Sequence, residues 1–89
     1  MQHSAVSVAN TATQLLRLNQ SKAGWIIANN GSVTVFIGGS GVTTANGLPL
    51  AAGEKMSSDG GTEFEGDVYG IVASGTCDTR VLEWGEGEI

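Results

Sequence analysis

The sequence is poor in the residues that build chemical sites, with one cysteine, one histidine and one proline among 89 residues. Cys77 has no second cysteine with which to form an intramolecular disulfide. This argues against a disulfide scaffold and fits a protein assembled in a reducing cytoplasm. His3 stands apart from any group that would orient it as a general base. We therefore predict no enzyme activity, no catalytic residue and no cofactor.

Basic residues are also scarce. Four Lys and Arg stand against nine Asp and Glu, which gives a formal net charge of −5 and a pI of about 4.4. Such a chain lacks the positive surface that binds a phosphate backbone or an anionic membrane. No apolar run approaches the roughly 20 residues of a membrane-spanning helix, and Met1–Ser4 has no signal-peptide character. We expect no nucleic-acid partner and no membrane partner.

Glycine, in contrast, is abundant, with 14 residues, and it interrupts short runs rich in Val, Ile and Thr. Glycines at this density mark tight turns between short strands. No stretch keeps a helical period long enough for a substantial helix. The pattern predicts an all-β fold, a small antiparallel β-sandwich or barrel of jelly-roll type with about six to eight short strands.

Two hairpins are predicted. In the first, residues 24–28 pair with residues 33–38 through Asn29-Asn30-Gly31-Ser32, where Asn-Gly supplies the positive φ angles of a type I′ turn. In the second, residues 67–73 pair with residues 79–84.

The loop of the second hairpin would place Cys77 in a turn. Gly70, inside the strand pattern, predicts a bulge or a close backbone approach.

The chain is expected to hold one domain. Residues 1–12, in which Val6 and Val8 alternate with small residues, are predicted to be an N-terminal arm or edge strand. Residues 13–84 would form a single β domain, and residues 85–89 a flexible acidic tail. A domain of this size has a thin core that contributes little stability. We therefore expect additional stability from self-association or from docking on a partner.

Three sets of residues have a functional and a structural interpretation. Glu63, Glu65 and Asp67 would converge on a cation if they shared one strand face, although a solvated acidic face is the simpler interpretation. The segment Gly38–Gly41 has the composition of a phosphate loop but lacks the following Lys and helix, which favours a turn. Four of the five aromatic residues are expected in the core, with a sugar-stacking platform as the alternative: Trp25, Phe36, Tyr69 and Trp84.

Several segments resemble small structural proteins of tailed bacteriophages. They are residues 29–32, the long string 35–54 from Val-Phe-Ile-Gly-Gly-Ser-Gly to Gly-Glu, and the later runs 68–76 and 79–84. The resemblance covers the chain from about Leu15 to Trp84. It is to capsid decoration (cement) proteins and to modules on head or tail fibres, and it brings no catalytic motif.

The resemblance implies a decoration protein on the capsid surface of the virion, assembled in the host bacterial cytoplasm. Its expected partners are itself, as a homo-trimer or dimer, and the major capsid protein or another virion protein. A head fibre, tail or spike component is the alternative, and a carbohydrate-binding module is a third interpretation. The expected interface residues come from one loop and from the N-terminal arm: Leu48, Pro49, Leu50, Val6 and Val8.

Overall fold

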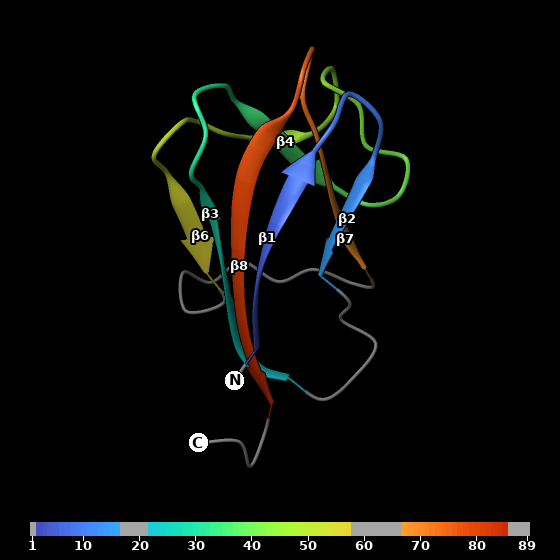
Figure 1. Ribbon diagram of the computed structural model, residues 1–89. Coiled ribbons are helices and arrows are strands. Elements are labelled where there is room, and N and C mark those ends of the chain that lie inside the picture. The colour runs from blue at the N-terminus through green and yellow to red at the C-terminus, as the bar shows by residue number, and fades with distance from the viewer. Residues whose placement is uncertain (1, 17–21, 58–66, 86–89) are drawn as a thin grey trace.

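The computed structural model describes residues 2–16, 22–57 and 67–85, which form eight strands and no helix. Sheet A has the strand order β1 (Gln2–Val8), β8 (Cys77–Gly85), β3 (Lys22–Asn29) and β6 (Lys55–Ser57). Sheet B has the order β2 (Thr13–Leu16), β7 (Val68–Ile71), β4 (Val35–Gly38) and β5 (Leu48–Leu50). All neighbouring strands are antiparallel (Figure 1), so the predicted all-β fold is confirmed.

The chain passes between the two sheets at almost every connection. Among the described strands, β4 and β5 are the only consecutive pair that are hydrogen-bonded neighbours. Both predicted hairpins are therefore wrong. β3 and β4 lie in opposite sheets, and so do β7 and β8. The predicted type I′ turn is also absent, because Gly53 and Gly75 are the only described residues with positive φ.

The error has a simple physical cause. Ile27 in sheet A and Val35 and Ile37 in sheet B all point into the shared core. The apolar side of each of these strands therefore faces the other sheet. Period-2 patterning shows that a run is a strand, but it does not show whether the next run lies beside it or opposite it.

The core lies between the sheets and draws on both. Leu15 and Leu16 are both buried because the pairing of β2 with β7 shifts register between Gln14 and Leu16. A bulge of this kind turns two successive side chains towards the same side. Twelve of the described residues are buried in this core: Val8, Leu15, Leu16, Trp25, Ile27, Val35, Ile37, Leu50, Val68, Val72, Cys77 and Val81.

Gly70 lies where the side chains of the core leave no room. A Cβ atom at this position would be 3.0 Å from Leu15 Cδ1 and 3.0 Å from Val35 Cγ1. These nearest neighbours are side-chain atoms and not backbone, so glycine is needed here to leave space for the side chains of the core.

The N-terminal segment is part of the domain. Gln2 to Val8 pair with Glu83 to Cys77 without interruption, and β1 forms one edge of sheet A. Of the predicted tail, Gly85 is the last residue of β8. Residues 86–89 lie outside the described residues, as do Glu63 and Glu65 of the predicted acidic face.

Candidate functional site

Those candidate residues for chemistry that the structure describes are not brought together. His3 is exposed on β1, opposite Leu82 of β8. Asp67 accepts a hydrogen bond from Gln14 Nε2 at 3.0 Å. Within the described ranges, no three His, Cys, Asp or Glu side chains form a group that could hold a metal ion. The same ranges contain no helix long and apolar enough to cross a membrane.

Cys77 lies in the core and not in a turn, which corrects the prediction from its sequence context. It is the first residue of β8 and is 2% exposed. Its thiol donates to Asn29 Oδ1 at 3.1 Å and to the Val33 carbonyl at 3.5 Å. A thiol so enclosed is inert towards reagents in solution, and we assign it a structural role.

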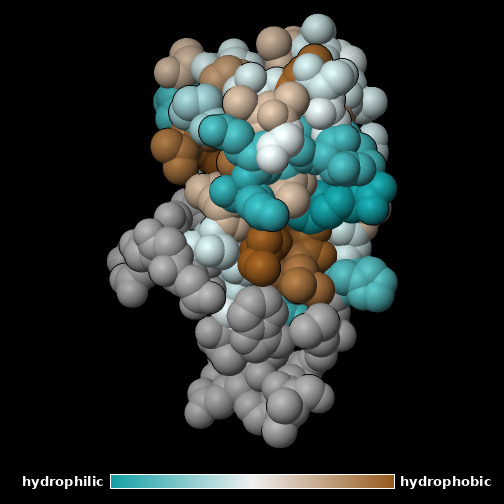
Figure 2. All heavy atoms as spheres, turned by 90° about the vertical axis from the view of Figure 1, so that its left-hand side faces the viewer, coloured by the Kyte–Doolittle hydropathy of each residue, from teal (hydrophilic) through white to brown (hydrophobic). Residues whose placement is uncertain are grey.

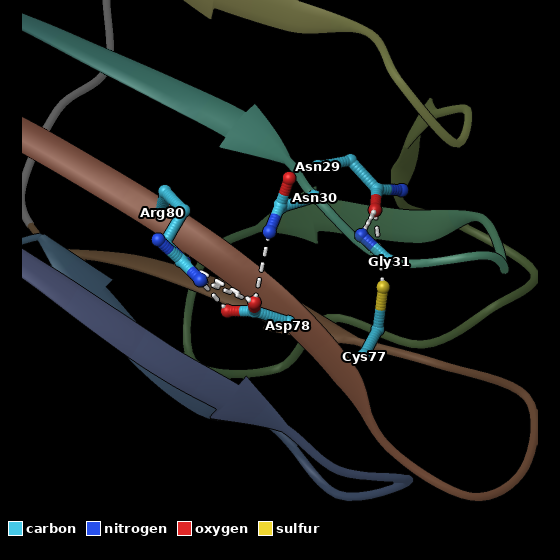
Figure 3. Close-up of polar contacts among 6 residues, drawn as sticks. All are labelled: Asn29, Asn30, Gly31, Cys77, Asp78 and Arg80. Atoms are coloured by element: carbon cyan, nitrogen blue, oxygen red, sulfur yellow. Dashed lines mark hydrogen bonds and ion pairs between the residues drawn. The ribbon is translucent and has the colours of Figure 1, made fainter.

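Asn29 is the centre of this buried cluster (Figure 3). Its Nδ2 donates to the carbonyl oxygens of Val33 at 2.7 Å and Leu50 at 2.9 Å. Its Oδ1 accepts from the Gly31 amide at 2.9 Å as well as from Cys77. The side-chain amide of Asn29 thereby fixes the crossing from β3 to β4, and Gly31 is held by its bond to Asn29 and not by a left-handed turn.

A second polar cluster joins the beginning of the β3–β4 connection to β8 on the solvent side of sheet A. Arg80 Nε and Nη2 donate to Asp78 at 2.9 and 2.8 Å, and Asn30 Nδ2 donates to Asp78 Oδ2 at 3.0 Å. The hydrogen bonds from Arg80 and from Asn30 lower the pKa of Asp78 to about 2. The arrangement is a surface ion pair and presents no reactive group.

The predicted interface residues divide into three groups. Leu48 and Pro49 are exposed on the edge strand β5, with Leu48 at 52%. Leu50 and Val8 are buried in the core, and Val6 is half-buried against it. A contact with a partner through β5 would therefore be made by Leu48 and Pro49.

Trp25 is 5% exposed and belongs to the core. The prediction of a core position is confirmed for this residue, and a sugar-stacking role for it is excluded. Phe36 and Tyr69 are half-buried on the outer side of sheet B.

The loop between β4 and β5 packs on the outer side of sheet B. Val42 is buried, and both it and Phe36 lie next to Gly47: a Cβ atom there would be 2.8 Å from Val42 Cγ2 and 2.7 Å from Phe36 Cβ. The amide of Val42 donates to the Gly39 carbonyl at 3.0 Å, so the predicted turn in the glycine-rich segment is confirmed. The amide of Thr43 donates to Asn46 Oδ1 at 2.7 Å.

This ordered loop and β5 share a feature of the sequence that the prediction missed. Residues 23–53 contain no Asp, Glu, Lys or Arg, although the whole chain has 13 such residues, four basic and nine acidic. We call its exposed part, from Ser40 to the end of β5, the neutral surface; it comprises Ser40, Gly41, Thr43, Thr44, Ala45, Asn46, Leu48 and Pro49. A scan for charge-free stretches would have found it.

The space-filling view shows how hydrophilic and hydrophobic residues are distributed over the β6 side of the molecule. Figure 2 shows a band of strongly hydrophilic residues across the middle of that side, with pale and brown residues above it and a further brown group directly below it. An uncharged, partly apolar surface on an acidic domain is suited to contact with another protein.

Comparison with protein-family models, with curated proteins and with solved structures found no match for this chain.

Proposed function

We propose that this chain is a structural protein of a tailed-phage virion, a decoration (cement) protein that binds the outside of the head as a homo-oligomer. The observation that carries the proposal is the neutral surface, an ordered and uncharged contact area on a domain with a net charge of −5. The sequence resemblance to decoration proteins supports the same role.

The mechanism is binding linkage. A protein that binds the assembled shell, and not its separated subunits, shifts the equilibrium towards the shell. Leu48 is the natural anchor because it is a large apolar side chain that the fold leaves half in solvent. Buried apolar anchors at the centre of an interface contribute most of its binding energy.

The test is binding to phage heads from which the protein is absent, measured by co-sedimentation. Leu48→Asp places a charge on the neutral surface and should weaken binding at least tenfold, because a carboxylate would be desolvated there. Val33→Asp is the matched control, since Val33 is also exposed, at 41%, but lies in the β3–β4 connection.

We expect Val33→Asp to bind within about twofold of the wild type, which corresponds to less than about 0.5 kcal/mol. Equal loss in both variants would mean that added charge, and not this surface, is responsible. Failure of the wild-type protein to sediment with heads would exclude the head-binding role. Copies confined to tails or fibres would favour the alternative of a fibre, tail or spike component.

A further inference from the structure

The four edge strands of the two sheets differ in how they are protected against pairing. β5 has three residues and contains Pro49, which has no amide to donate, and β6 has three residues and carries Lys55. β2 has four residues and a register shift. Short length, proline, lysine and bulges are the devices that keep an edge from joining another strand.

β1 has none of these devices. Its seven residues, Gln2 to Val8, keep an unbroken register with β8 and include no proline, glycine, Lys, Arg, Asp or Glu. Among the described strands, none pairs with its outer side. Alternate residues of an edge strand direct their backbone N–H and C=O groups away from the sheet. β1 therefore offers a straight row of such groups.

The side chains of β1 favour a second copy of the same strand. His3, Ser4, Ala5 and Ser7 are exposed and small or neutral, so two antiparallel copies would bring no like charges together. This matters because each chain carries a net charge of −5 and whole molecules repel one another. A two-fold axis at Ala5 would align all seven residues and place Ala5 opposite Ala5 of the second copy.

We propose that β1 pairs antiparallel with β1 of a second copy, joining two four-stranded A sheets into one continuous sheet of eight strands. The proposal rests on the homo-oligomer part of the proposed function and names its interface. One pair of strands buries less than the roughly 1,200 Å² of a standard protein interface. We therefore expect a reversible dimer at micromolar concentrations in the free protein, which a capsid would stabilise.

The test is sedimentation velocity of the free protein over a concentration series. Ala5→Glu places two carboxylates opposite each other at the two-fold axis and should raise the dimer dissociation constant at least tenfold. Ala52→Glu makes the same change at an exposed position in the turn between β5 and β6, and it should dimerise like the wild type. Circular dichroism establishes that both variants are folded.

Hydrogen exchange of the wild-type protein gives a second readout that needs no variant. Every other amide of β1 should gain protection as the protein concentration rises, because only the outward-facing amides find a new acceptor. A protein that remains monomeric throughout, or an Ala5→Glu variant that dimerises like the wild type, would overturn the proposal. A monomer that still binds phage heads would refute the β1 pairing and leave the head-binding role intact, whereas a β1 dimer that does not bind heads would support the pairing and refute the head-binding role.

Discussion

At the scale of single residues, the buried polar groups decide how the chain crosses between the sheets. Asn29 uses its amide to hold the carbonyl groups of Val33 and Leu50 and the amide of Gly31. Buried polar groups left without partners are costly, so this residue fixes one path for the chain. The sequence pattern showed Asn29 only as a turn former, because its partner Leu50 lies 21 residues away.

Gly31 is required by the cysteine beside it. A Cβ atom at Gly31 would collide with Cys77 Sγ. We expect Gly31→Ala to reduce the free energy of unfolding by about 1–3 kcal/mol, the range for overpacked cores. In the double variant Gly31→Ala/Cys77→Ala the added methyl group enters the space left by the sulfur. The decrease in its free energy of unfolding should therefore be smaller than the sum of the decreases in the two single variants. Strict additivity in urea denaturation would show that the two positions are not in contact.

Thr79 is a weak point of the core. It is fully buried, and its Oγ1 has no hydrogen-bond partner among the residues that the structure describes. Thr79→Val keeps the shape and removes the unpaired hydroxyl, which should raise the free energy of unfolding by about 1 kcal/mol. Thr76→Val, at an exposed position before β8, should change it by less than about 0.5 kcal/mol. A less stable Thr79→Val protein would imply that the hydroxyl is satisfied in solution.

At the scale of the elements, existence and type of the strands could be predicted, whereas their partners could not. The runs around Ile27, Val35 and Val81 were recognisable as strands from their apolar alternation. Their pairing depends on contacts between distant residues, such as Val8 with Cys77 in β1 and β8. No local turn signal encodes such a contact, and the two glycine-containing loops were therefore mistaken for hairpins.

Asp78 of β8 accepts a hydrogen bond from Asn30, the residue that follows β3, and the contribution of Asp78 to stability should depend on pH. The pKa of Asp78 is lowered from 3.8 to about 2 in the folded protein. A carboxylate with a lowered pKa stabilises the fold above its unfolded pKa, and this contribution disappears as the pH falls from about 4 to 2. Between pH 5 and pH 2, the wild type should therefore lose more stability than Asp78→Asn. The comparison cancels the other carboxylates, and equal slopes in the two proteins would contradict the assignment. Because the pair is exposed to solvent, we expect the difference to be small.

At the scale of the whole molecule, charge and apolar surface are separated along the sequence. All nine acidic residues follow Gly53, whereas β1 and the segment 23–53 have no Asp, Glu, Lys or Arg. Composition alone predicted an acidic domain with no enzyme activity. It did not reveal which part of the surface is neutral, because that depends on the loop after β4 being packed down by Val42.

Two uncharged regions of this acidic domain thus have distinct proposed partners: the neutral surface for the head and the β1 edge for a second copy. The most direct test of the decoration role is a cryo-EM reconstruction of the virion that carries this chain. We expect density for the two facing sheets on the outer surface of the head, with Leu48 and Pro49 turned towards the capsid. Particles that lack the chain, or that carry it only on the tail or a fibre, would contradict this role.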